Sequence, residues 1–223
     1  VEHDSEAAHN LCHRIARHEH LTEQTLRRLS RLSGHELAEA LVCGLHAEKH
    51  AVSSDHFFAL DPLPNLLMSR DPQVVIGNGV IISSMRRGAR AREAQLSQFM
   101  FAHHPEFRDN ERYFDFHGDA KATRDPRFGS LTLEGGDVLV LKEGVVAVGV
   151  SERTMEQSID LLAQTLRKQD WCNTLIMVRM PGSRSQMHLD TIFTRISDNE
   201  CLVYPPMFYE GYAETLSVVS LDL

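Results

Sequence analysis

The sequence is poor in the features that mark several classes of protein. Only 4 of its 223 residues are cysteines, and they are widely spaced, without the CxxC pairs of a zinc site: Cys12, Cys43, Cys172 and Cys201. No apolar run approaches the roughly 20 residues that span a bilayer. The formal net charge is −8, which disfavours an extended contact with nucleic acid. We therefore expect reduced thiols, a cytoplasmic location, and neither a membrane nor a nucleic acid as partner.

The amino-terminal residues do not resemble a targeting signal. Val1 to Asp4 include charged side chains and no apolar segment, so we expect no secretory signal peptide there. Because the sequence does not start with Met, we expect that it begins inside a longer gene product.

Histidine is comparatively abundant, with 13 residues. Two pairs, His9 with His13 and His46 with His50, are spaced four apart, which places each pair on one face of a helix. A metal site and a solvated helix surface both fit this spacing. Neither pair has a second cluster to complete four ligands, so we predict no metal site.

The first part of the chain has the pattern of helices. Apolar residues from Leu11 to Leu29 fall near helical spacing among many charged residues. Ser33 and Glu36 fit a capping box that starts the next helix. We predict a small helical subdomain over residues 1–57.

From residue 58 to residue 223 the chain alternates strand-like and helix-like stretches, which is the pattern of an α/β domain. Three stretches, near residues 71–82, 137–150 and 190–203, share one order: an aspartate, an apolar strand, a tight turn and a second strand. Helices are predicted over 89–102 and 154–167, after the first two. The Asn78-Gly79 dipeptide predicts a hairpin turn, because both residues tolerate a positive φ.

Three aspartates, Asp71, Asp137 and Asp190, lead these repeats. If the repeats pack around a pseudo-symmetry axis, the three carboxylates surround a common centre, where like charges repel unless a cation joins them. The alternative is that each aspartate only caps a turn.

Four strings in order carry a resemblance to a known family. They are Pro64–Pro72 (PNLLMSRDP), Leu133–Asp137 (LEGGD), Ser151–Thr154 (SERT) and Met187–Thr191 (MHLDT). In sequence and spacing, residues 58–210 resemble the arginine deiminases, and the helical front resembles that family's helical insertion more loosely.

The resemblance implies a pentein fold, a five-bladed α/β propeller of ββαβ-type units. The chain would hold about three of the five units as a partial pentein propeller, with the small helical subdomain in front. The first unit would precede Val1. The last unit, which carries the family's nucleophilic cysteine, would follow Leu223.

The resemblance also implies roles for the most polar positions. Asp71 and Asp190 would grip a guanidinium, His188 would be the general acid and base, and Glu134 would orient His188. A planar cation with five donors suits bidentate carboxylates. On a predicted strand, His188 and Asp190 would share one face. The alternatives are that Asp190 caps a turn and that His188 is a core histidine.

Three further residues are implied as contacts to the substrate. Arg90 and Arg153 would clamp the α-carboxylate, and Asn65 would bind nearby. For Arg90 the alternative is a solvated basic cluster: Arg86, Arg87, Arg90 and Arg92. Met68 departs from the aromatic residue that family members often carry beside the aliphatic part of the substrate.

The implied reaction is hydrolysis of L-arginine to citrulline and ammonia through a covalent cysteine-amidino intermediate, without a metal or an organic cofactor. None of the four cysteines lies where the family's nucleophile lies, so we expect this chain alone to be inactive. Two alternatives stay open: an amidinotransferase, and a non-catalytic guanidinium-binding protein or degenerate paralogue. A homo-oligomer is compatible with each of these functions.

Overall fold

A computed structural model describes residues 5–47, 57–109, 111–115, 124–125, 129–168, 171–209 and 216–223. The chain forms two compact units, Val1–Met68 and Ser69–Leu223. This boundary falls later than the predicted one between residues 57 and 58. Strand β2 (Phe58–Leu60) pairs with β1 (Leu45–His46), and this pairing ties residues 58–60 to the helical unit.

The first unit is built from three helices, α1 (Ser5–His18), α2 (Glu23–Leu29) and α3 (Gly34–Cys43). Its core includes side chains from all three: Leu11, Ile15, Leu29 and Leu41. The predicted capping box is confirmed. The hydroxyl of Ser33 accepts the N–H of Glu36 at 3.4 Å, and the N–H of Ser33 donates to the Glu36 carboxylate at 2.9 Å.

The histidine pairs lie partly outside what the structure describes. His9 and His13 are exposed on α1, with ring centroids 4.4 Å apart. His46 stacks on Phe58, whereas His50 lies outside the described residues. Of the helices in the described ranges, none has the length and apolar character needed to cross a bilayer.

The second unit contains two segments of ββαβ order, and the first begins at β3 (Gln73–Ile76). Strand β4 (Gly79–Ile82) returns antiparallel to β3. Helix α4 (Ala91–His103) then crosses over, and β5 (Glu111–Asp115) pairs parallel with β4. The predicted hairpin and the predicted helix over 89–102 are confirmed, the latter to within two residues.

The second ββαβ segment repeats this topology. Strands β8 (Val138–Lys142) and β9 (Val145–Val150) form an antiparallel hairpin, α5 (Glu156–Lys168) crosses over, and β10 (Thr174–Arg179) pairs parallel with β9. Strand β13 (Ser217–Asp222) adds antiparallel to β10, which gives the order β13-β10-β9-β8. The α/β class predicted from the alternation is confirmed.

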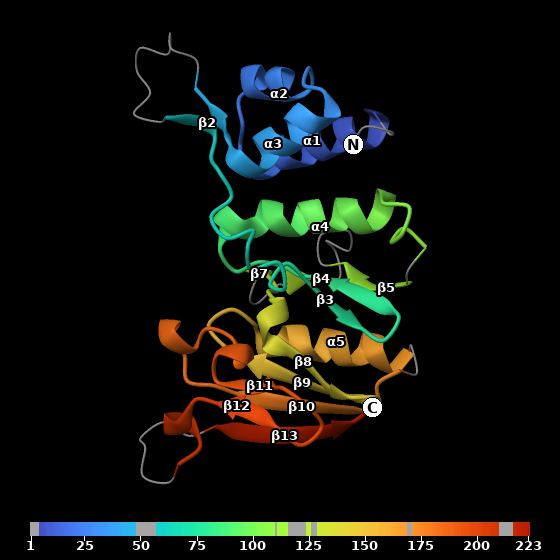
Figure 1. Ribbon diagram of the computed structural model, residues 1–223, viewed down its shortest axis with the longest axis vertical. Coiled ribbons are helices and arrows are strands. Elements are labelled where there is room, and N and C mark those ends of the chain that lie inside the picture. Colours follow the sequence, from blue (N-terminus) through green and yellow to red (C-terminus); the bar gives the residue numbers. More distant parts are fainter. Residues whose placement is uncertain are drawn as a thin grey trace. The chain divides into compact units, whose positions relative to one another are not determined.

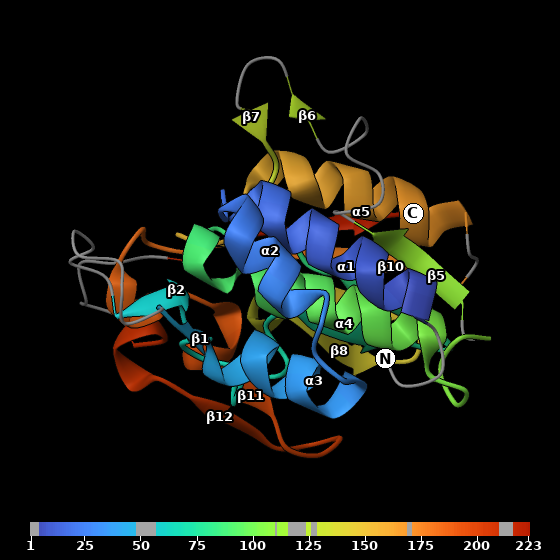
Figure 2. The same ribbon diagram turned by 90° about the horizontal axis from the view of Figure 1, so that it is seen from above.

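The third predicted hairpin is also present, as β11 (Phe193–Arg195) and β12 (Cys201–Val203) in a two-stranded sheet of their own. Another small pair is formed by β6 (Arg124–Asp125) and β7 (Gly129–Ser130), which Figure 2 shows beyond α5 at the edge of this unit. Five short 3-10 helices complete the described elements: η1 (Gly88–Arg90), η2 (Gly135–Asp137), η3 (Arg184–Gln186), η4 (Leu189–Thr191) and η5 (Pro205–Met207).

The turn of the first hairpin differs from the prediction by one residue. Ile76 pairs with Gly79, so the two-residue loop is Gly77-Asn78. Only Gly77 has a positive φ, of 55°, which fits a type II′ turn better than the predicted Asn78-Gly79 turn. A Cβ at position 77 would also lie 2.2 Å from the ring of Trp171. Position 77 therefore requires glycine for two reasons: the positive φ, and the lack of space for a Cβ beside Trp171.

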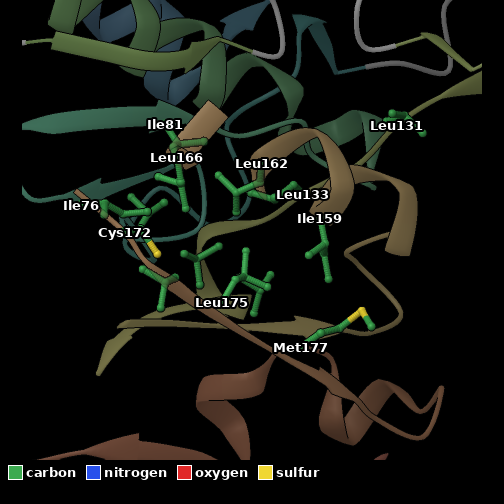
Figure 3. Close-up of a cluster of buried hydrophobic side chains, with 14 residues drawn as sticks. Ile76, Ile81, Leu131, Leu133, Ile159, Leu162, Leu166, Cys172, Leu175 and Met177 are labelled. Carbon is green, nitrogen blue, oxygen red and sulfur yellow. The ribbon is translucent and has the colours of Figure 1, made fainter. Parts of the chain in front are cut away.

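The second unit is layered (Figure 1). Helix α4 covers one face of the β3-β4-β5 sheet, where Val80, Ile82 and Phe101 form a cluster. Helix α5 lies between that sheet and the β8-containing sheet, and Figure 3 shows the large cluster that fills this space. Its members come from both sheets and from α5: Val74, Ile76, Ile81, Val138, Val146, Val148, Ile159, Leu162, Leu166, Leu175 and Met177, among others.

We expect Leu162→Ala to destabilise the second unit by about 2–5 kcal/mol, because Leu162 is only 1% exposed and its truncation leaves a cavity between the two sheets. Leu202→Ala is the matched control, since Leu202 on β12 is 66% exposed. Urea unfolding of both variants measures the difference. Equal midpoints for the two variants would contradict this packing.

Candidate functional site

Two short turns carry the predicted polar residues. Glu134 directly precedes η2, and His188 directly precedes η4, in an extended conformation. The predicted strand through His188 and Asp190 is wrong, because residues 189–191 form a 3-10 turn. The carbonyl of His188 accepts the N–H of Thr191 at 3.1 Å and its hydroxyl at 2.6 Å, so the backbone turns back on itself and does not pair as a strand.

His188 lies between two carboxylates. Its Nε2 is 2.8 Å from Oε2 of Glu134, and its Nδ1 is 3.7 Å from Oδ1 of Asp71. All three residues are buried. The structure thus brings together three of the four residues predicted to be catalytic, on segments that lie far apart in the sequence.

Glu134 is held as a carboxylate by its surroundings. Burial raises its pKa, but the hydrogen bond with His188, the backbone N–H of Arg86 and the nearby charges outweigh burial, so the pKa is lowered. The N–H of Arg86 donates to Oε1 at 2.8 Å, and Nη1 of Arg153 is 3.8 Å from Oε2. Glu134 is therefore an acceptor that orients and charges His188.

One oxygen of Asp71 is hydrogen-bonded to Arg90. Nη1 of Arg90 donates to Oδ2 of Asp71 at 2.5 Å, while its Nε and Nη2 donate to Glu93 at 3.1 and 2.7 Å. Burial opposes the charge of Arg90, yet Glu93 and Asp71 raise its pKa above the ordinary value. The guanidinium predicted to clamp a substrate carboxylate is thus engaged by two carboxylates of the protein. The i,i+3 spacing of Arg90 and Glu93 was visible in the sequence and was missed.

Asp190 lies at the rim of this group and is partly exposed. Its Oδ2 is 3.7 Å from Nη1 of Arg70, beyond hydrogen-bond distance. Burial raises the pKa of Asp190, against the lowering effect of His188 and Arg70. Arg70 also donates to the carbonyl of Val138 at 2.7 Å, and its proximity to Asp190 was not predicted.

The three aspartates that lead the repeats are electrostatically coupled to His188: the charges of Asp71 and Asp137 raise the pKa of His188, and the charge of His188 opposes the rise that burial causes in the pKa of Asp190. Burial lowers the pKa of His188, but the hydrogen bond to Glu134 and the charges of Asp137 and Asp71 outweigh it, so the pKa is raised. Asp190 responds to the charge of His188 in turn. The three aspartates therefore lie near enough to His188 to interact with its charge, and Asp71 is 3.7 Å from its ring.

The remaining predicted residues differ in what the structure says of them. Arg153 is buried near Glu134, and its Nε makes no hydrogen bond to a described residue. Asn65 belongs to the first unit, where its carbonyl accepts the N–H of Met68. The predicted substrate contacts of Arg153 and Asn65 stay predictions.

Gly136 explains why the LEGGD string needs glycine. A Cβ at position 136 would lie 2.5 Å from Nδ1 of His188, closer than side-chain atoms can approach. The imidazole therefore packs directly on the backbone of η2, and any larger residue would push it out of line with Glu134.

Asp71, Glu134 and His188 each offer one ligand atom, and these atoms all lie within 4.8 Å of one another. A divalent ion would find three suitable ligands there. However, Arg90 and Arg153 already approach the two carboxylates, and these fixed positive charges disfavour a second, divalent one. A planar guanidinium suits the group better, since it binds carboxylates through directed N–H donors.

None of the four cysteines belongs to this group of ligand atoms. Cys172 is buried in the large core cluster, where burial raises the pKa of its thiol. Cys201 is exposed on β12, and Cys12 and Cys43 belong to the first unit. The geometry thus supplies an acid, a base and carboxylates, and it assigns no nucleophile.

Comparison with known proteins gives one consistent family. Residues 3–220 match the family model for arginine deiminase. The chain is 36% identical to arginine deiminase 1 of Staphylococcus epidermidis over 194 residues, which are 81% of this chain and 44% of that protein. It is 41% identical to an arginine deiminase of Listeria welshimeri over 155 residues, which are 69% of this chain and 36% of that protein. The chain spans less than half the length of these curated relatives.

The similarity to a solved structure concerns the fold only. DDAH from Pseudomonas aeruginosa, solved as a mutant complexed with citrulline, matches with a TM-score of 0.50 at 18% identity. The match covers 65% of this chain and 49% of that one.

The raised pKa of His188 predicts a pH-dependent stability. The folded state holds this proton more tightly than the unfolded chain does, so the stabilisation is fully present below the ordinary pKa of 6.5 and is lost as pH rises through the raised value. His188→Gln removes this contribution. The difference in free energy of unfolding between wild type and variant should therefore shrink as pH rises from about 6 to about 9.

Urea unfolding across this range measures that difference. His18→Gln is the control, because His18 is exposed at the end of α1. A difference that stays constant with pH for His188→Gln would show that His188 does not carry the proton in the folded state.

Proposed function

The chain belongs to the arginine deiminase family, and from this premise we propose that it forms the guanidinium-binding and proton-transfer part of a hydrolase that converts L-arginine to citrulline and ammonia. The observation that carries the proposal is the buried imidazole of His188 between the carboxylates of Glu134 and Asp71. Such an arrangement binds a cation and moves a proton at the same place.

Two carboxylates have an oxygen free to receive the substrate's guanidinium. Oδ1 of Asp71 faces His188 at 3.7 Å, and Oδ2 of Asp190 faces Arg70 at 3.7 Å. Both distances exceed a hydrogen bond. A guanidinium between Asp71 and Asp190 would place its carbon beside the imidazole, in reach of proton transfer.

The proposed reaction has two steps. A cysteine thiolate attacks the guanidinium carbon, the C–S bond forms, and the protonated His188 gives its proton to the departing nitrogen, which leaves as ammonia. The neutral His188 then accepts a proton from water, which attacks the amidino carbon. As the resulting adduct collapses, its hydroxyl loses the second proton to solvent, the C–S bond breaks, citrulline leaves and the thiolate returns. The raised pKa of His188 favours the acid form that the first step needs.

The α-carboxylate is assigned to Arg153. Its Nε is buried, lies 3.9 Å from Oε1 of Glu152 and makes no hydrogen bond to a described residue. A substrate carboxylate at hydrogen-bond distance would satisfy this donor. Arg90, which Asp71 and Glu93 already engage, is assigned to holding Asp71 in place of the clamp suggested by the family resemblance.

For the fold, we propose that the chain is part of a pentein propeller. The two ββαβ segments supply two of its five units, and the β11–β12 hairpin starts a third. The likeness to DDAH supports this topology. The helical unit in front would be the small subdomain predicted from the sequence.

A second candidate is a protein that binds guanidinium without cleaving it. The observation that favours it is that no cysteine belongs to the group around His188. The proposed binding roles are the same for both candidates, so binding and turnover have to be measured separately.

Binding is tested with two ligands that differ in one group. L-arginine carries an α-carboxylate and agmatine lacks it. We expect Arg153→Lys to weaken arginine binding by about 1–3 kcal/mol, through loss of the bidentate fork, and to leave agmatine binding nearly unchanged. Asp190→Asn should weaken both ligands. Asp160→Asn, at an exposed position of α5, is the control, and calorimetry of the four proteins is the measurement. An unchanged agmatine affinity in Asp190→Asn would refute the guanidinium assignment.

Turnover is tested by assaying citrulline released by the 223-residue chain. We expect none, because the described cysteines lie outside the site. Citrulline release that is abolished by His188→Ala and by one cysteine-to-serine variant would make the chain an enzyme by itself and identify its nucleophile. Transfer of the amidino group to an added amine would indicate an amidinotransferase.

A further inference from the structure

Asp137 is a fully enclosed carboxylate near the site, with no exposed surface. It ends the η2 turn that begins after Glu134. Both of its oxygens are occupied. Oδ1 accepts the backbone N–H of Leu189 at 2.9 Å, and Oδ2 accepts the hydroxyl of Ser151 at 2.6 Å. A carboxylate so enclosed and so paired cannot contact a substrate directly.

The contact with Leu189 fixes the turn that carries the proton-transfer group. Leu189 lies between His188 and Asp190, and its N–H donates to Asp137 at the end of η2. The two turns are therefore joined at two points, by the Glu134–His188 side-chain bond and by the Asp137–Leu189 bond. The second point restricts the rotation of one turn against the other, which a single point would leave free.

The contact with Ser151 fixes a third segment. The hydroxyl of Ser151 accepts the N–H of Arg153 at 2.9 Å and that of Thr154 at 3.1 Å. The hydroxyl of Thr154 in turn accepts the N–H of Glu134 at 3.1 Å. The loop that presents Arg153 is thereby tied back to η2 through Asp137 and Ser151.

The space around Asp137 is closed by Gly149 on β9. A Cβ at position 149 would lie 2.4 Å from Oδ1 of Asp137 and 3.0 Å from Cβ of Leu189. The carboxylate and the η4 turn therefore pack directly on the strand backbone, which excludes water from the junction.

From these contacts we propose that Asp137 is the positioning residue that assembles the site, by joining the turn of Glu134, the turn of His188 and Asp190, and the loop of Arg153 through one buried carboxylate. The proposal rests on the proposed function for the roles of these residues. The geometry of the junction does not depend on that function.

The electrostatic surroundings agree with this role. The ionisable groups that face His188 are Asp71, Glu134, Asp137 and Asp190, with three arginines behind them: Arg70, Arg90 and Arg153. Burial raises the pKa of Asp137 to about 6, with His188, Ser151 and Leu189 opposing that rise. At neutral pH Asp137 is thus an anion whose charge favours the protonated imidazole.

The test uses two variants that separate the charge of Asp137 from its tether. Asp137→Asn keeps the shape and removes the charge. Ser151→Ala keeps the charge and removes the tether to the Arg153 loop. Asp160→Asn on the exposed face of α5 is the control. The readouts are the NMR titration of the His188 ring, assigned with His188→Gln, the pH dependence of the Leu189 amide signal, and the affinity for arginine and for agmatine.

In wild type the Leu189 amide should shift with a midpoint near the Asp137 pKa of about 6, and this shift should vanish in Asp137→Asn. The His188 pKa should fall in Asp137→Asn and change little in Ser151→Ala. Ser151→Ala should weaken arginine about tenfold, as expected for a lost charge-assisted contact, and spare agmatine.

Retention of both the Leu189 titration and the His188 pKa in a folded Asp137→Asn variant would overturn the proposal. Should that variant fail to fold, Ser151→Ala decides, and equal weakening of arginine and agmatine would overturn it. If neither ligand binds wild type while the His188 and Leu189 shifts follow Asp137, the proposed function fails and the positioning role stands.

Discussion

The bond of 2.8 Å between His188 and Glu134 joins two groups that are both buried. Removing a carboxylate and an imidazolium from water costs several kcal/mol each, and their mutual attraction offsets this only when their other positions are also satisfied. Here they are. Glu134 receives the N–H of Arg86 and lies near Arg153, while Asp71 and Asp137 favour the charge on His188. Loss of either partner would leave the other buried and charged without its shortest contact, and the weaker contacts around the site would have to hold that charge alone.

The fold brings these groups together through its repeated topology. In each ββαβ segment an aspartate stands just before the first strand, Asp71 before β3 and Asp137 before β8. The sheets pack on opposite sides of α5 around one continuous core. The short segments that precede their first strands therefore converge. Glycines 135, 136 and 149 permit the final approach, because a Cβ at each would meet Arg70, His188 or Asp137 at 2.1 to 2.5 Å.

Local patterns predicted much of this from the sequence. The capping box at Ser33, the three hairpins and the two crossover helices depend on spacing within a few residues, and all are present. The features that local patterns did not predict depend on contacts between residues far apart in the sequence. The turn after His188 forms because Asp137 accepts the N–H of Leu189 across 52 residues, and no periodicity near position 188 reveals that partner. The substrate role of Arg90 was implied by the family resemblance, and no local pattern reveals that the fold pairs Arg90 with Asp71 across 19 residues.

The balance of charge indicates why this site should receive a monocation. The ion pairs that connect to His188 include six carboxylates and four arginines. The carboxylates are those of Asp71, Glu93, Glu134, Asp137, Glu152 and Asp190, and the arginines are Arg70, Arg87, Arg90 and Arg153. With His188 protonated, one negative charge is left over. A divalent ion would overcompensate it, whereas a guanidinium would neutralise it and use its directed donors on Asp71 and Asp190. In the proposed reaction, loss of the proton from His188 would leave one negative charge uncompensated beside the bound guanidinium. That charge would oppose departure of the imidazole proton until the leaving nitrogen accepts it, so in the proposed reaction proton transfer and loss of ammonia would be coupled by the carboxylates proposed to bind the substrate.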